Sequence, residues 1–155
     1  MSVTWNGDKL HSRIRKALLL GLNDAARIVG EKAATSISGG SKTGSVYNKK
    51  FFTIGSGEGR IVVPFGRKPS HQASAEGEAP ASETGALLAS SEIVIDVAQM
   101  SVTVGFTSDH AAYLEFGTSG EVGMEPRPFL RPALNSSHEE IVDAIASAVR
   151  VEIKP

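Results

Sequence analysis

The residues of this chain that could carry out catalysis are four histidines, 17 carboxylates and a number of serines. No serine lies in a G-x-S-x-G arrangement, and no local pattern joins a serine to a histidine. His138-Glu139 begins like a zinc-binding helix, but residue 142, where that pattern needs a second histidine, is a valine. Segment 36–43 resembles a phosphate-binding loop, yet serines stand where its two glycines are required. We therefore expect no enzyme activity, no metal site and no cofactor.

Glu115 is the carboxylate whose neighbours in the sequence are the most unusual. It lies among the apolar residues of segment 111–116, so we expect it to be partly buried and to need a cation. Arg127 or Arg131 could supply that cation through a bidentate pair. We interpret Glu115 as half of a structural ion pair rather than as a catalytic acid.

Basic residues gather in the stretch 42–68 and could face DNA. They are Lys42, Lys49, Lys50, Arg60, Arg67 and Lys68. Aromatic residues in the same stretch could stack on exposed bases. A nucleic-acid-binding module that uses this region is therefore one interpretation of the chain.

The charge of the chain is divided unequally along its length. Residues 1–68 hold 12 Lys/Arg and four Asp/Glu, a net charge of +8, whereas residues 69–155 hold four and 13, a net charge of −9. One interpretation is a basic surface and an acidic surface on one domain, suited to docking between copies. The other is that the two halves mix in space and cancel.

The length and composition predict one folded domain over residues 1–155. The absence of cysteine excludes disulfides, thiolate metal centres and a cysteine nucleophile. No apolar run approaches the ~18–20 residues of a membrane span, so we expect no membrane contact. The N-terminus lacks the pattern of a signal peptide, and synthesis in the cytoplasm is the expectation.

A long helix is predicted over residues 8–36, with Asp8 as its N-cap and Gly39-Gly40 as its end. Its apolar positions recur at helical spacing: Leu10, Ile14, Leu18, Leu22, Ala25, Val29 and Ala33. A strand over 46–54 and a short strand over 60–64 follow. Loop 66–86 has almost no large apolar side chain, and we expect neighbouring subunits to hold it.

The second half of the chain begins with the clearest strand pattern. Residues 92–97 and 101–106 predict a β-hairpin with its turn at Ala98-Gln99 and one buried face. Ser108-Asp109 should cap a short helix over 110–116 that Gly117 ends, and a polar loop over 118–125 follows. A closing helix over 137–151 should pack beside the first.

The start of the closing helix has two interpretations. Ser136-x-x-Glu139 matches a capping box, but Pro128 or Pro132 could instead stand in the first turn of a longer helix. The fold class is therefore α+β, with a long N-terminal helix and a C-terminal helix packed on a small antiparallel sheet, and with long ordered loops.

Three segments, in this order and spacing, resemble the tail-component or tail-completion family of long-tailed double-stranded DNA bacteriophages, which includes minor tail protein Z-like neck proteins. They cover residues 84–91, 113–118 and 126–134. The residues that carry the resemblance are Thr84, Gly85, Tyr113, Glu115, Phe116, Gly117, Pro128, Phe129, Arg131 and Pro132.

The resemblance implies a structural virion protein of the head–tail junction or upper tail, assembled in the cytoplasm of a host bacterium. Such a protein would form a homo-oligomeric ring, expected to be six-fold, with other neck and tail proteins as partners and a passage in which DNA makes non-specific contact. A tail terminator or a head-closure protein is an alternative ring component. Loops 66–86 and 118–125 would then reach adjacent subunits.

The motif residues also carry expectations about the structure. Gly117 should adopt a positive φ. Tyr113, Leu114 and Phe116 should anchor the short helix on the sheet, and Phe129 and Leu130 should fill the core.

Overall fold

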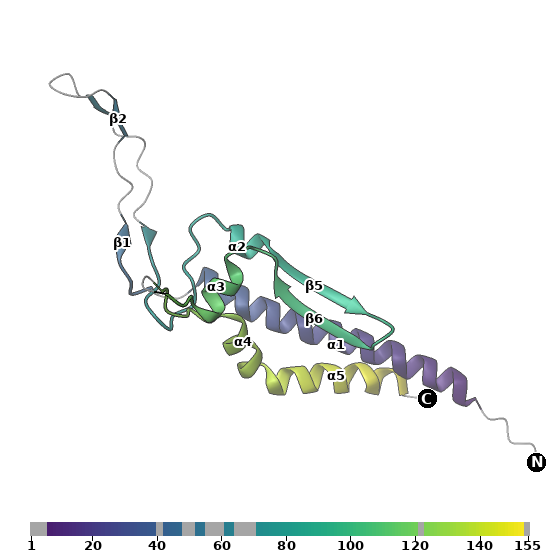
Figure 1. Cartoon of the computed structure of the whole chain (residues 1–155). Coiled ribbons are helices and arrows are strands. Elements are labelled where there is room, and N and C mark those ends of the chain that lie inside the picture. Colours follow the sequence, from purple (N-terminus) through teal and green to yellow (C-terminus); the bar gives the residue numbers. More distant parts are fainter. Residues whose placement is uncertain are drawn as a thin grey trace, which may run out of the picture.

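A computed structural model of the chain describes residues 6–39, 42–47, 52–54, 61–63, 71–120 and 123–153. Its elements, in chain order, are α1 (Gly7–Ser38), β1 (Val46–Tyr47), β2 (Phe52–Ile54), β3 (Ile61–Val63), β4 (His71–Gln72), α2 (Ala86–Ala89), β5 (Ser91–Asp96), β6 (Ser101–Phe106), α3 (Ala111–Phe116), α4 (Leu130–Ser136) and α5 (His138–Ile153). The predicted α+β class is confirmed. Figure 1 shows α5 on one side of α1 and the hairpin β5–β6 on another, with β1 and β2 leading away from this body.

The buried face of α1 is made mostly of small residues. Its buried positions are Ala17, Gly21, Ala25, Ala26, Val29, Gly30, Ala33 and Ile37. The predicted apolar face is confirmed from Ala25 onward, is half-buried at Ile14, Leu18 and Leu22, and is wrong at Leu10, which is 44% exposed. In this first half the fully buried positions are the small residues Ala17 and Gly21. The reason is the closeness of α5: a Cβ on Gly21 would lie 2.7 Å from the Cα of Ile145. A leucine does not fit between backbones at that distance.

Both ends of α1 differ in detail from the prediction. Asn6 is the N-cap and makes no side-chain capping bond, while Asp8 lies in the first turn, where its charge complements the helix dipole. The backbone N–H of Gly39 ends the helix by donating to the carbonyl of Thr35. Gly40 lies outside the described residues.

Two ion pairs join α1 to α5. Arg13 pairs with Glu152 at 3.4 Å, and Lys32 pairs with Glu140 at 2.6 Å. In each pair the base comes from the basic half of the sequence and the acid from the acidic half. The halves therefore mix in space along these two helices, as one of the two interpretations of the charge requires.

The hairpin β5–β6 pairs in an unbroken antiparallel register from Ser91↔Phe106 to Asp96↔Ser101. The predicted strands are confirmed, with the turn at residues 97–100. The buried face is less complete than predicted, because Ile95 is 47% and Val97 61% exposed. The hairpin meets α1 mainly through β6 and less through β5, and no other strand of the described part of the chain pairs with β5.

The core lies where α1, β6, α3 and α4 meet. Phe129 is 2% exposed, and its ring meets that of Phe106 edge-on with the centroids 5.0 Å apart. The prediction that Phe129 fills the core is confirmed, and Leu130 packs against the same cluster while partly buried. Pro132 lies in the first turn of α4, where its missing N–H is not needed.

The predicted capping box at the start of the closing helix is wrong. The Ser136 hydroxyl donates to the carbonyl of Ala133 at 3.1 Å, and the buried Ser137 hydroxyl donates to the same carbonyl at 2.7 Å. Both serines therefore bond backward into α4. The chain passes from α4 to α5 through Ser137, so the closing helix α5 begins at His138, next to its predicted start, and Pro132 stands in the first turn of the separate seven-residue helix α4.

The short helix α3 is oriented differently from the prediction. Its buried residues are Ala111 and Glu115, whereas Tyr113 is 55% and Phe116 60% exposed. Leu114 packs on the core as expected, but Tyr113 and Phe116 do not anchor the helix. Its N-cap is His110, without a side-chain bond, so the expected capping by Ser108-Asp109 is also wrong.

The arm is the ribbon formed by β1, β2, β3 and β4. Val46 and Tyr47 pair with Gln72 and His71, and β2 pairs with β3. The strand predicted over 46–54 is described at its two ends, as β1 and β2, and residues 48–51 lie outside the described part. β3 confirms the middle of the strand predicted over 60–64. The described part of loop 66–86 contains β4 and the start of α2 and is not structureless.

Candidate functional site

The side chain of Glu115 caps the beginning of α4. One carboxylate oxygen accepts from the backbone N–H of Phe129 at 2.8 Å and of Leu130 at 3.0 Å. The other accepts from the N–H of Arg131 at 3.0 Å. These amides are donors that a helix start leaves unpaired, and the helix dipole favours a negative charge there. Glu115 thus binds the second motif segment to the third.

The predicted ion pair of Glu115 with Arg127 or Arg131 is wrong, because backbone amides take the place of the cation. The Arg131 guanidinium instead lies over the ring of Phe116, 4.4 Å from its centroid. Arg127 donates its backbone N–H to the carbonyl of Leu114 at 2.7 Å. Its side-chain Nε is buried without a hydrogen-bond partner. Both arginines therefore contact α3, but neither side chain binds the Glu115 carboxylate.

Gly117 has the predicted positive φ, 75°. A Cβ at this position would lie 2.6 Å from the carbonyl oxygen of Met124, so a larger residue is excluded by space as well as by conformation. Thr118 closes the following loop, because its N–H donates to the Met124 carbonyl and its hydroxyl accepts from the Met124 N–H. The described part of loop 118–125 is therefore held by its own chain.

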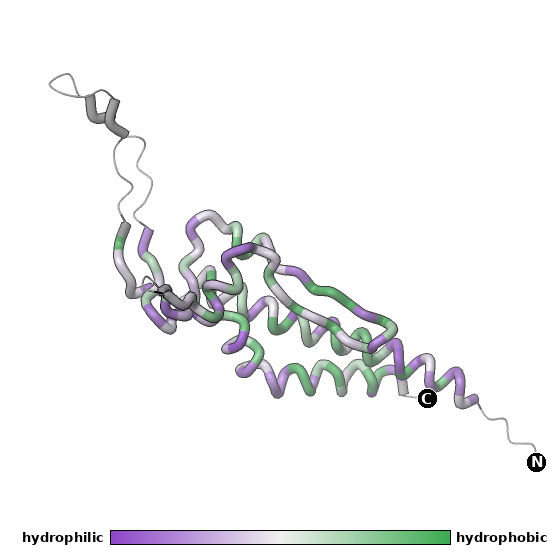
Figure 2. The backbone as a smooth tube through the Cα atoms, viewed as in Figure 1, coloured by the Kyte–Doolittle hydropathy of each residue, from purple (hydrophilic) through white to green (hydrophobic). Residues whose placement is uncertain are grey.

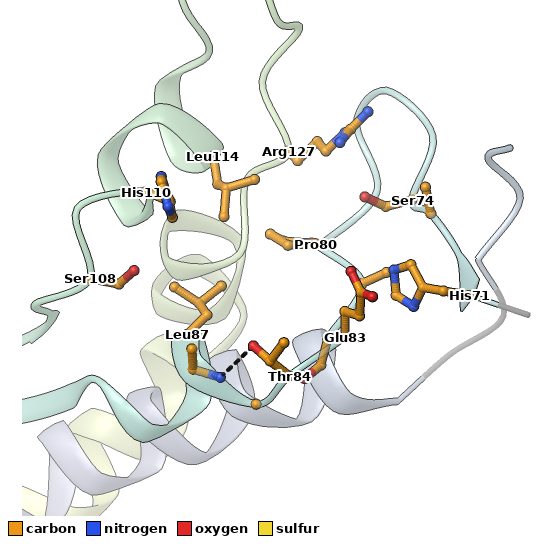
Figure 3. A pocket seen from close by; sticks show the side chains of 15 residues that line it. His71, Ser74, Pro80, Glu83, Thr84, Leu87, Ser108, His110, Leu114 and Arg127 are labelled. Atoms are coloured by element: carbon orange, nitrogen blue, oxygen red, sulfur yellow. Dashed lines mark hydrogen bonds between the residues drawn. The ribbon is translucent and has the colours of Figure 1, made fainter. Parts of the chain in front are cut away.

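The first motif segment faces a pocket of about 280 Å³ between the base of the arm and α3. Gly85, with φ 77°, is the N-cap of α2, and the Thr84 hydroxyl accepts from the N–H of Ala86. Figure 3 shows that Leu87 and Leu114 also border this pocket. The three motif segments, which are separated in sequence, are thus neighbours at the junction of α2, α3 and α4.

The pocket is lined by side chains of types that occur in catalytic sites, but no hydrogen bond of the described residues joins a histidine to a serine there. His71, Ser74, Ser108, His110 and Arg127 line it. In the described part of the chain, neither imidazole is hydrogen-bonded to a hydroxyl, so neither activates a serine as a general base would. The described residues also contain no group of three or more His, Asp or Glu that could hold a metal ion.

Two side chains lock the base of the arm to the body. Glu78 accepts from the hydroxyl of Thr43 at 2.5 Å, the N–H of Thr43 at 3.1 Å and the N–H of Ala75 at 2.9 Å. The Lys42 ammonium donates to the carbonyls of Ser36 and Ala79, both at 2.9 Å. The outgoing and returning strands of the arm are therefore joined to each other and to the end of α1.

These contacts correct two expectations. Lys42 does not face DNA, because its ammonium is bound to two carbonyls of its own chain. The other five residues proposed to face DNA, Lys49, Lys50, Arg60, Arg67 and Lys68, lie outside the described residues. Neighbouring subunits are not needed to hold residues 71–86, since bonds such as Gly77 N–H to the Pro126 carbonyl already do so.

Glu78 was not singled out from the sequence, and Lys42 was singled out only as a residue that could face DNA. The most distant partner of Glu78, Thr43, is 35 residues away in the chain, and that of Lys42, Ala79, is 37 residues away. No local spacing pattern predicts such bonds.

The lock at Glu78 should respond to pH. The Thr43 hydroxyl, followed by the N–H groups of Ala75 and Thr43, lowers the pKa of Glu78 from 4.5 to about 2. Because the folded-state pKa is depressed, the stabilisation is present above about pH 4.5 and is lost as the pH falls through about 2. We expect a carbon NMR titration of the Glu78 carboxyl to show its midpoint near pH 2. Thr43→Val should move that midpoint upward, and a wild-type midpoint near 4.5 would show that the lock is not formed.

Comparison with known proteins gives no relative from which to transfer a function. Neither the family models, nor the curated proteins, nor the solved structures include a match to this chain. Within the described residues, no helix is long and apolar enough to cross a membrane. The functional argument therefore depends on the motifs and on the geometry of the described residues.

Proposed function

We propose that this protein is a structural virion protein of the phage neck or upper tail, which forms a ring around a passage for DNA. The observation that carries the proposal is the arm. Figure 1 shows it leaving the body at the C-terminal end of α1, with β2 farther from the helices than β1. A two-stranded ribbon that packs on nothing is only marginally stable in water. Such an arm is suited to contact with another molecule.

The lock at the base of the arm supports this role. Glu78 and Lys42 bind the base of the arm to the C-terminal end of α1, so the direction of β1 and β4 relative to the body is set before a partner arrives. An arm with a set direction loses less conformational entropy on binding than a flexible one. This is the property that a repeated subunit contact requires.

The body also has apolar side chains that remain exposed. Tyr113, Phe116 and Leu134 on α3 and α4, and Val94 and Val97 at the hairpin, are each at least half exposed. Exposed apolar patches often mark protein–protein contacts. A ring needs two different surfaces on each copy, because every subunit meets its two neighbours through opposite sides of one repeated contact.

The motif resemblance supports the particular assignment to the neck or upper tail. The three segments that resemble the tail-completion family meet around Glu115, Phe129 and Gly85. They act there as a scaffold. Glu115 caps a helix, Phe129 is a core aromatic residue, and Gly85 is a helix N-cap with a positive φ. Scaffold residues of this kind suit a structural protein.

Two measurements test the proposal. Negative-stain electron microscopy of the purified protein, with mass photometry over a range of concentrations, should show a discrete closed ring. Immunogold labelling of the native particle should place the protein between head and tail. A protein that remains monomeric up to its solubility limit, or a label elsewhere on the particle, would contradict the proposal.

A further inference from the structure

The outer edge of β5 is open. Within the described residues, the backbone of residues 91–96 forms hydrogen bonds only with β6, in a sheet of two strands. Natural proteins commonly protect such edges with lysine, proline or a bulge, because an unpaired edge is a template for another strand. β5 reads Ser-Glu-Ile-Val-Ile-Asp and pairs with β6 without a bulge. It has no lysine, proline or bulge, and its two charged residues, Glu92 and Asp96, flank an uncharged middle at residues 93–95.

The side chains beside this edge are apolar on both faces of the sheet. Val94 is 53% and Ile95 47% exposed, and successive residues of a strand point to opposite faces. Figure 2 shows the same hydrophobic stretch in the middle of β5. An added strand would therefore both pair with the backbone of β5 and cover these two side chains.

The described part of the arm has unpaired strand edges, and the arm has a charge opposite to that of the hairpin. β2 and β3 form an antiparallel ribbon, from Phe52↔Val63 to Ile54↔Ile61, whose two outer edges pair with no other described strand. Residues 46–72 contain five basic residues and one acidic residue, whereas the hairpin segment 91–106 contains two acidic residues and no basic one. Opposite charge favours the approach of the arm to the hairpin.

The base of the arm and the hairpin lie at different places along α1. The lock at Glu78 and Lys42 holds β1 and β4 at the C-terminal end of α1, whereas the hairpin extends along α1 toward the N-terminal end (Figure 1). This separation and the opposite charges favour a second copy of this chain as the occupant of the β5 edge.

We propose that the β2–β3 ribbon of one copy adds to the open edge of β5 in the next copy, which forms a four-stranded sheet shared between two subunits. The inference rests on the proposed ring-forming function and names the contact that closes the ring. Backbone hydrogen bonds give such strand additions their affinity. Each copy donates one arm and offers one edge, so the contact is head-to-tail and can close by rotation.

Three variants test this contact. The first replaces residues 48–70 by Asn-Gly, a type I′ turn, which rejoins the paired residues Tyr47 and His71 and removes β2 and β3. The second, Val94→Lys with Ile95→Lys, places charge on both faces of the edge. The control is Val142→Lys on α5, because Val142 is 53% exposed, as Val94 is. Circular dichroism and thermal melts establish that each variant is folded.

Size-exclusion chromatography with light scattering, which separates the 16.3-kDa monomer from larger species, should then give the following results. The wild type and Val142→Lys form the ring, and the armless and edge-blocked variants are each monomeric. An equimolar mixture of the armless and edge-blocked variants forms a dimer and nothing larger, because one copy supplies the only arm and the other the only free edge. Rings that survive the arm deletion, or a mixture that stays monomeric, would overturn this contact alone. A monomeric wild type would contradict both the contact and the proposed ring.

Discussion

Replacement of Glu115 by alanine should lower the free energy of unfolding by about 3 kcal/mol, since hydrogen bonds to charged groups contribute roughly 1.5–3 kcal/mol and buried donors left unpaired cost more. Three backbone N–H groups lose their acceptor, at the start of α4 beside the core residue Phe129. For a chain of this length the melting temperature should fall by about 9 °C. Differential scanning fluorimetry and urea titration measure both quantities.

Two further variants separate the helix cap from the ion pair that the sequence predicted. Glu115→Gln keeps one carbonyl oxygen, so its loss should be smaller than that of Glu115→Ala. Arg131→Met removes only the contact with the Phe116 ring and should cost about 0.5–1 kcal/mol. Asp143→Ala, at an exposed position of α5, serves as the surface control. If Arg131→Met and Glu115→Ala destabilised the protein equally, an ion pair rather than the cap would be the main interaction.

Gly21→Ala should lower the free energy of unfolding by about 2 kcal/mol, although alanine is the better helix former by about 1 kcal/mol. The added Cβ would lie 2.7 Å from the Cα of Ile145 and 3.2 Å from the Cβ of Ala148. The first of these neighbours is backbone, so α1 and α5 must move apart to admit it. The midpoint of urea unfolding is the measurement.

Gly30→Ala on the same helix is the matched control. Its Cβ would meet the Cγ2 of Val104 at 3.6 Å, which is an ordinary van der Waals contact. We therefore expect the gain in helix propensity to remain, up to about 1 kcal/mol. The two glycine variants should change stability in opposite directions, and a loss of similar size in both would contradict the close approach of α1 and α5 at Gly21.

The sequence by itself determined those features that depend on near neighbours along the chain. The helical period over residues 8–36 predicted α1, the alternation over 92–106 predicted β5 and β6, and Gly117 predicted its own positive φ. In each case the physical cause, a side-chain period or the lack of a Cβ, lies within a few residues. The fold class followed from the order of these elements.

The tertiary structure alone decided which groups meet across long stretches of chain. It gave Glu115 three amides in place of an arginine, and it bound Lys42 to carbonyls in place of DNA. It also buried the face of α1 that contains Gly21, because α5 approaches there. The free energy of a buried polar group depends on which partners surround it in space, and a spacing pattern within one segment carries no information about partners 14 or 37 residues away.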